Sequence, residues 1–289
     1  MKIAVASGKG GTGKTFVAVN LFHSLKNKGK CVALADCDVE VPNALAFFEA
    51  DLCNEIEVTE FRPIIHNDQC VFCGKCVEYC EYHAIFYMPS SRYIRLLNDL
   101  CHGCAACSVA CESGAIENSS TVVGTVSSYK YQNSVCLAEG RMTTGHPSPV
   151  PLIKATMKNA FQDQSEYELY DSPPGTSCPF IQTVAKSDFV ILVTEPTPFG
   201  LSDLKQAIDT LLTMGKAFGV VINRAGLGDR EVYDYLERNG YTLLAEIPFE
   251  EEIARLYSEG KVVSEHHEGA NRVFHSLADK LIAYGNSSN

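Results

Sequence analysis

Two runs of four cysteines are the part of this sequence best suited to chemistry. The first is Cys70-x-x-Cys73-x-x-Cys76-x-x-x-Cys80, and the same pattern returns 31 residues later as Cys101-x-x-Cys104-x-x-Cys107-x-x-x-Cys111. Thiolates are the protein ligands that iron–sulfur clusters and zinc prefer. Three cysteines so closely spaced can hold three corners of a cubane from one loop, with the fourth a turn further on. We therefore expect two metal centres in this part of the chain.

The spacing of both runs resembles that of two-cluster bacterial ferredoxins, in which the fourth cysteine ligates the other cluster. Ferredoxins usually have a proline after the fourth cysteine, whereas Glu81 and Glu112 stand there in this chain. Zinc is the alternative metal, but zinc ribbons pair two C-x-x-C units rather than two tandem runs of four. The expected clusters are two [4Fe–4S] centres, one held by Cys70, Cys73, Cys76 and Cys111, the other by Cys101, Cys104, Cys107 and Cys80.

A glycine-rich stretch near the N-terminus fits the phosphate-loop pattern G-x-x-x-x-G-K-[ST]. Its residues are Gly8, Lys9, Gly10, Gly11, Thr12, Gly13, Lys14 and Thr15. Glycines let successive backbone N–H groups point into one concavity, which attracts phosphate together with the following helix N-terminus. We expect Lys14 to reach the β- and γ-phosphates and Thr15 to ligate Mg²⁺. The alternative is a chance glycine-rich turn, but the motif stands between an expected strand and an expected helix, as a phosphate loop requires.

The string Lys-Gly-Gly-x-Gly-Lys-Thr resembles the deviant phosphate loop of MinD/ParA-type ATPases, a group related to the nitrogenase iron protein and the Mrp-type ATPases. The resemblance covers about residues 1–59 and 150–289 and implies an ATP-dependent homodimer. In such a dimer Lys9 would reach the nucleotide of the partner subunit. Taken singly, Lys9 is an ordinary loop lysine.

The same resemblance assigns further residues. Asp38 would orient or deprotonate the attacking water, Asp36 would lie near the Mg²⁺ shell, and Asp171 would hold Mg²⁺ through water. Each acid follows an expected strand, and in parallel sheets these strand ends form the ligand crevice. Each alone could equally be a loop or helix-cap residue. Asn223, Arg224 and Pro248 match the positions that recognise adenine.

Two cysteines outside the runs suggest a third cluster. Cys178 follows Asp171 by seven residues, the offset at which the nitrogenase iron protein has a ligand to a cluster shared between subunits. Cys136 is the second cysteine that such a bridging cluster would need. The alternative is two ordinary thiols. Two clusters would give about 8 Fe per chain and three about 10.

The surrounding pattern is that of an α/β protein with a mostly parallel sheet flanked by helices. The pattern predicts buried strands over 2–6, 31–35, 168–171, 189–193, 219–222 and 243–247, helices over 16–25, 201–212, 250–257 and 271–284, weaker strands over 122–126 and 134–137, and a frayed tail over 285–289. The cysteine runs interrupt this pattern. We expect a discontinuous P-loop ATPase domain over 1–59 and 119–289, with a small α+β ferredoxin-like domain inserted over 60–118.

Composition and net charge argue against several classes of function. The formal net charge of −11 argues against nucleic-acid binding and against a polybasic membrane anchor. Apolar residues never run to the ~18 that a spanning helix needs, and the N-terminus reads as a strand rather than a signal peptide. We expect a cytoplasmic protein. Thirteen cysteines in a reducing compartment indicate metal ligands rather than disulfides.

Three functions compete for this combination. The first is an ATPase, slow or stimulated by a partner, whose hydrolysis couples dimer rearrangement to electron transfer through the clusters. The second is an iron–sulfur or metal-cofactor assembly ATPase, although the chain lacks the Cys-Pro-x-Cys usual in Mrp-type carriers. The partner would be a redox protein in the first case and a cofactor acceptor in the second. A MinD-like positioning protein is disfavoured because the last helix has no basic amphipathic face.

Overall fold

The computed structural model describes residues 1–132, 134–159 and 165–287, and the chain divides into two compact units. Two long strands, β3 (Asp51–Ile65) and β6 (Ile116–Tyr131), each have residues in both units. Unit 1 comprises Met1–Glu55, Val126–Arg141 and Ile153–Asn289, and unit 2 comprises Ile56–Thr125 and Met142–Leu152.

A large sheet forms the centre of unit 1. In the described part of the chain it has nine strands in the order β11-β10-β9-β1-β8-β2-β7-β6-β3, and every neighbouring pair from β11 to β7 is parallel. This confirms the predicted large, mostly parallel sheet. Its other strands are β1 (Lys2–Ala6), β2 (Val32–Asp36), β7 (Ser134–Met142), β8 (Tyr167–Asp171), β9 (Phe189–Thr194), β10 (Phe218–Ala225) and β11 (Leu243–Pro248).

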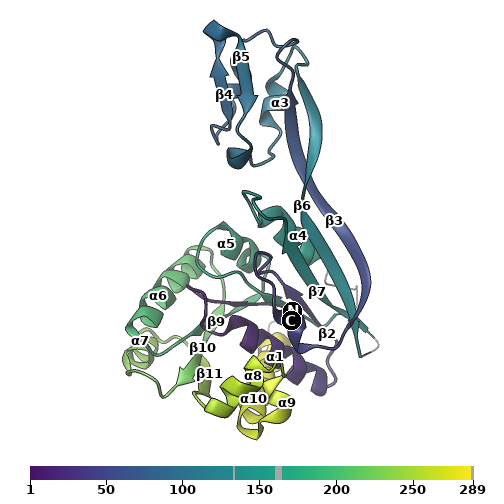
Figure 1. The fold of residues 1–289 in the computed structure, drawn as a ribbon. Helices are drawn as coiled ribbons and strands as arrows, with labels where there is room; N and C mark the ends of the chain where they lie inside the picture. The colour runs from purple at the N-terminus through teal and green to yellow at the C-terminus, as the bar shows by residue number, and fades with distance from the viewer. Residues whose placement is uncertain (133, 160–164, 288–289) are drawn as a thin grey trace. The chain divides into compact units, whose positions relative to one another are not determined.

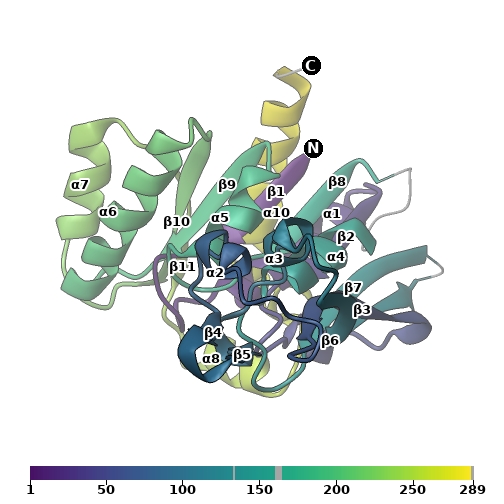
Figure 2. The ribbon, with the colours of Figure 1, turned by 90° about the horizontal axis from the view of Figure 1, so that it is seen from above.

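Helices cover this sheet, and Figures 1 and 2 both show α6 and α7 side by side next to β10. Helix α1 packs against α10, where the rings of Phe16 and Phe274 meet edge to face at 5.5 Å. Both rings are buried in the main core, so α1 is fixed directly behind the phosphate loop. The helices are α1 (Lys14–Asn27), α4 (Val150–Asn159), α5 (Cys178–Ala185), α6 (Pro198–Thr213), α7 (Glu231–Asn239), α8 (Glu251–Ser258), α9 (Val263–His266) and α10 (Glu268–Ser287).

Apart from its parts of β3 and β6, unit 2 is built from short elements. The strands β4 (Ile85–Met88) and β5 (Tyr93–Leu96) pair as an antiparallel hairpin, and α2 (Lys75–Glu78) and α3 (Ala106–Ala110) each begin inside a cysteine run. Its small core combines aliphatic side chains with thiols, namely Cys76, Ile85, Ile94, Cys107 and Ile116. Single 3-10 turns occur at Ala44–Phe47 in unit 1 and at Pro89–Ser91 and Asn98–Leu100 in unit 2.

The predicted strands and helices all occur, with ends shifted by a few residues. The prediction of a frayed tail over 285–289 is wrong for residues 285–287, because α10 continues to Ser287. Residues 288–289 lie outside the described chain. The Ser287 hydroxyl donates to the Tyr284 carbonyl, and Tyr284 packs on the core, which holds this end. None of the helices in the described ranges is both long and apolar enough to cross a bilayer.

Candidate functional site

The phosphate-loop residues connect β1 to α1. Gly13 immediately precedes α1 with φ of 96°, a left-handed conformation that glycine adopts without strain. A Cβ at this position would lie 2.3 Å from Asn223 Nδ2. That amide donates a 2.9 Å hydrogen bond to the Thr12 carbonyl, so the end of β10 supports the loop from the side. The loop therefore has both the backbone shape and the neighbour that exclude a larger residue.

A cavity of about 480 Å³ opens in front of this loop. Most residues predicted to contact nucleotide line it, namely Gly10, Gly11, Gly13, Lys14, Thr15, Asp38, Asn223, Arg224 and Pro248. Gly8, Thr12, Asp36 and Asp171 do not line it, and neither does Lys9, which is half-buried. The structure adds walls that sequence reasoning missed, chiefly Asn43, Pro174 and the α8 side chains Ile253, Ala254 and Tyr257.

Buried carboxylates lie at the strand ends beside the cavity. Asp36 and Asp171 are register partners on β2 and β8, and both are almost fully buried. Thr15 Oγ1 donates to Asp171 Oδ2 over 2.6 Å. Asp171 Oδ1 is buried without a hydrogen-bond partner in the described structure. A hydrated Mg²⁺ would satisfy that orphaned oxygen, so the residues present fit the expected metal.

Burial sets the protonation of these acids. It raises the pKa of Asp36 to about 6, although the backbone N–H groups of Ala44, Asn43 and Asp38 donate to its carboxylate and oppose the shift. Burial also raises the pKa of Asp171, and the nearby Asp36 raises it further. Two acids so close in low dielectric disfavour simultaneous ionisation unless a cation is present. A divalent metal ion would therefore allow both acids to be ionised.

Asp38 differs from this pair because it lines the cavity. Burial raises its pKa, while the positive charge of Lys14 acts in the opposite direction. A carboxylate here is positioned to face a nucleotide's phosphates or a water beside them.

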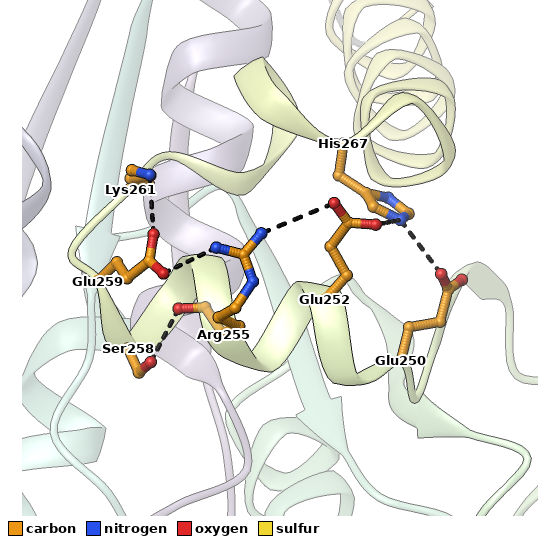
Figure 3. Close-up of polar contacts among 7 residues, drawn as sticks. All are labelled: Glu250, Glu252, Arg255, Ser258, Glu259, Lys261 and His267. Carbon is orange, nitrogen blue, oxygen red and sulfur yellow. Dashed lines mark hydrogen bonds and ion pairs between the residues drawn. The ribbon is translucent and has the colours of Figure 1, made fainter.

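Residues of α8 and of the loop before it form one wall of the nucleotide cavity. Figure 3 shows Glu250 and Glu252 reaching toward His267, whose Nε2 lies 3.1 Å from Glu250 Oε2. On the same helix Arg255 forms ion pairs with Glu252 and Glu259, the latter at 2.7 Å. These contacts link α8 to the residue just before α10. They hold the wall that Ile253, Ala254 and Tyr257 form.

Arg224 also lines this cavity. It has a positive φ of 54°, and its guanidinium forms a 2.6 Å ion pair with Glu195. The Arg224 N–H also donates to Asn223 Oδ1. Because the pair fixes Arg224, the adjacent Asn223 is presented toward the phosphate loop rather than toward solvent.

The two cysteine sets line two separate cavities of unit 2. One is lined by Cys70, Cys73, Cys76 and Cys111 among other residues, and the other by Cys80, Cys101, Cys104 and Cys107. Burial, with a smaller contribution from Cys70, raises the pKa of Cys76 to about 11. Iron binding must therefore displace a proton there.

Within the described residues, no three His, Cys, Asp or Glu side chains converge tightly enough to hold a single metal ion. A cubane differs from a single-ion site because each cysteine binds a different iron atom. Four thiols spread around one cavity suit that requirement. The donor set, four cysteines per cavity, fits [4Fe–4S] chemistry.

Arg62 supports the loop of the second cysteine set. Its guanidinium donates to the carbonyls of Asn98 and Cys101 and pairs with Glu60 at 3.0 Å. His146 Nε2 lies 3.2 Å from the same oxygen, Glu60 Oε1. The hydrogen bonds of Arg62 fix the start of the Cys101–Cys107 loop.

The cysteines of the predicted bridging cluster lie in different surroundings. Cys178 is exposed at the first residue of α5, whereas Cys136 is 4% exposed within β7 and belongs to the main core. Lys26 Nζ donates to its sulfur, and its thiol donates to the Tyr131 carbonyl, each over 3.8 Å. A ligand shared between subunits has to be accessible at the surface. Cys136 would have to leave the core to serve as one.

Comparison with known proteins decides the family. Residues 3–263 match the CobQ/CobB/MinD/ParA nucleotide-binding domain. The chain belongs to this family. It is therefore an ATP-binding P-loop NTPase of the MinD/ParA kind, which accounts for the cavity in front of Gly10–Thr15.

Individual relatives agree with this assignment. An uncharacterised protein of Methanocaldococcus jannaschii is 30% identical over 266 residues, 90% of either chain. The crystal structure of the cell-division ATPase MinD of Pyrococcus furiosus covers 98% of both chains with a TM-score of 0.59 and 22% identity, a likeness of fold alone. An iron–sulfur cluster carrier protein of the same species is 51% identical over 47 residues, 16% of each chain.

Proposed function

We propose that this protein is a Mg²⁺-dependent ATPase that acts as a homodimer and couples nucleotide state to electron transfer through two [4Fe–4S] clusters. The observation that carries the proposal is the grouping of eight cysteines around two cavities, four at each, in a chain that also belongs to the MinD/ParA family. The four at each cavity are the four that ferredoxin-type spacing assigns to one cluster. An electron relay and a nucleotide switch thus share one chain.

In the ATPase unit we assign six residues. Lys14 neutralises the phosphates, and Thr15 and Asp171 hold Mg²⁺, the latter through water with Asp36 beside it. Asp38 orients the attacking water. Lys9, outside the cavity of its own chain, is left available to reach the nucleotide of a second copy. Hydrolysis would then depend on dimerisation.

In unit 2 the eight cysteines would hold the clusters, which supply one-electron transfer when bound. The chain's own part is to shield and orient them. Ile94 and Ile116 line the first cavity with the thiols, and Leu96 and Ala84 line the second. Arg62 sets the position of the Cys101 backbone. Nucleotide can influence the clusters only if ATP and ADP have different affinities for two conformations.

A second function is favoured by a separate observation. The short match to an iron–sulfur cluster carrier protein supports a role in assembling or delivering iron–sulfur or another metal cofactor. The match covers only 16% of each chain, so we place it second.

One experiment separates the two functions. The anaerobically reconstituted protein is incubated with an apo-ferredoxin, with and without MgATP, while iron transfer and cluster oxidation state are followed together. Retention of about 8 Fe per chain through turnover, with ATP-dependent change of oxidation state, supports electron transfer. Loss of one cluster to the acceptor supports assembly. The Lys14→Ala variant, deficient in phosphate binding, controls for effects of ATP outside the loop.

A further inference from the structure

A second large cavity of unit 1 lies apart from the nucleotide cavity. It measures about 670 Å³ and shares no lining residue with the cavity at the phosphate loop. Helices α4 and α5 contribute to it, together with β1 and β8. Its lining residues are Lys2, Lys154, Met157, Lys158, Tyr170, Gln182 and Lys186.

Lysines dominate this cavity although the whole chain carries a net charge of −11. Lys154 and Lys158 are one turn apart on α4, so they share a face. On α5 the same spacing separates Gln182 from Lys186, which caps the helix C-terminus. Two helices therefore each direct a pair of polar or cationic side chains at one space.

Three of the four lysines have no counter-ion among the residues that the structure describes. Lys154, Lys158 and Lys186 are exposed, and their ammonium groups form no hydrogen bond or ion pair with any described residue. Only Lys2 is paired, at 3.3 Å from Glu168 Oε2.

The paired lysine belongs to a fixed floor. The Glu168 oxygen that meets Lys2 also accepts a 2.8 Å hydrogen bond from the Tyr170 hydroxyl. Lys2 and Glu168 are register partners on β1 and β8. The cavity thus combines a rigid polar floor with three unpaired ammonium groups around it.

Unpaired like charges gathered on one face repel one another, as do Lys154 and Lys158 one helical turn apart. A monovalent anion would relieve one such charge. A multivalent anion would bridge the ammonium groups of α4 and α5 together. The volume falls within the range of about 300–1,000 Å³ that is usual for small-molecule sites.

From these features we infer that the cavity binds a small anion that carries two or more phosphate or carboxylate groups. Such a ligand would accept hydrogen bonds from Lys154, Lys158 and Lys186, and Gln182 would add an amide donor. The site is separate from the nucleotide cavity, so the inference does not depend on the function of the clusters.

The test is calorimetric titration with pyrophosphate and citrate, with acetate as the monovalent comparison. All titrations use the Lys14→Ala background, which is deficient in phosphate binding at the phosphate loop, and contain no nucleotide or EDTA, because both are themselves multivalent anions. The test variant is Lys154→Ala/Lys158→Ala, and the matched control is Lys130→Ala/Lys205→Ala, which removes the same charge from exposed positions outside the cavity. Thermal unfolding confirms that both variants fold.

We expect pyrophosphate or citrate to bind and acetate not to bind. The test variant should bind at least about tenfold more weakly, a loss of about 1.4 kcal/mol, and the control should match the unaltered protein. Equal weakening in both variants would mean general charge attraction and would overturn the inference. The inference would also be overturned if neither pyrophosphate nor citrate bound, or if a polyglutamate peptide bound and the two small anions did not.

Discussion

The hydroxyl of Thr15, in the first turn of α1, donates a 2.6 Å hydrogen bond to Asp171 Oδ2 at the end of β8. The phosphate loop and the acid at the end of β8 are therefore joined directly, although 156 residues separate them. The other carboxylate oxygen of Asp171 is buried and unpaired in the described structure. Mg²⁺ would enter a place where a hydroxyl and a carboxylate already meet.

Replacing Thr15 with valine should selectively weaken metal-dependent nucleotide binding. Valine keeps the shape but removes the hydroxyl, so MgADP affinity should fall by about ten- to a hundredfold, or about 1.4–2.8 kcal/mol. ADP affinity in EDTA should change little. Thr15→Ser is the matched control, because it keeps the hydroxyl. Calorimetry with both ligands would refute the assignment if the valine variant lost both affinities equally.

Metal binding at this site should depend on pH. Burial raises the pKa of Asp36 from 3.8 in the unfolded chain to about 6 in the folded protein, and raises that of Asp171 also. The protonated Asp36 side chain therefore stabilises the folded protein. This stabilisation is fully present below the unfolded pKa of 3.8 and is lost as the pH rises through the folded pKa of about 6. Mg²⁺ favours the ionised acids and offsets that loss.

MgADP should therefore raise the unfolding temperature more at pH 7 than at pH 5. Thermal unfolding at both pH values measures this, with ADP in EDTA as the reference ligand. A larger increase at pH 5 would contradict the account of the paired acids.

Gly13 and Asn223 should be energetically coupled. Alanine at position 13 would meet the Asn223 amide at 2.3 Å and would also hold an unfavourable positive φ, so Gly13→Ala should destabilise the protein by about 1–3 kcal/mol. Adding Asn223→Ala removes the clash but not the backbone strain. The double variant should then cost less than the sum of the single changes, by at least about 0.5 kcal/mol in a denaturant-unfolding cycle. Strict additivity would show that the two residues do not meet.

The crossed arrangement of cysteines makes a specific prediction for iron content. Cys111→Ser should impair the same cluster as Cys70→Ser, although Cys111 is the last cysteine of the second run. Each variant should retain about 4 of about 8 Fe, and the two should leave the same electron paramagnetic resonance signal. Cys80→Ser should leave the other. Stoichiometric zinc in place of iron, or pairing of Cys111 with Cys101 in these spectra, would contradict the assignment.

Local sequence determines much of this site. Gly8–Thr15 dictates a phosphate loop by itself, and Asp36 and Asp171 could be located because each ends a short apolar strand. Walls supplied by tertiary packing could not be foreseen in this way. Ile253 and Tyr257 look like ordinary core residues of α8 in the sequence, yet they close the nucleotide cavity.

Other parts of the structure have a sequence pattern that is too weak to predict them. Strand β3 is largely exposed, with Glu55, Glu57 and Glu60 along it, so its hydrophobic periodicity is faint. The lysine-lined cavity is formed by residues of β1, β8, α4 and α5, and none of these segments has a sequence pattern that predicts it. For Cys136, proposed as the second ligand of a bridging cluster, the sequence did not reveal that its thiol packs in the main core.

The central claim is that nucleotide bound by the MinD/ParA-type unit controls electron transfer from clusters in unit 2. The most direct test is stopped-flow measurement of cluster oxidation in the reduced, reconstituted protein mixed with a one-electron acceptor, with and without MgATP. We predict at least about a tenfold faster oxidation with MgATP, equivalent to about 1.4 kcal/mol, and no acceleration in Lys9→Ala, which retains nucleotide binding but lacks the contact to the partner. Equal rates with and without MgATP in the unaltered protein would contradict the account.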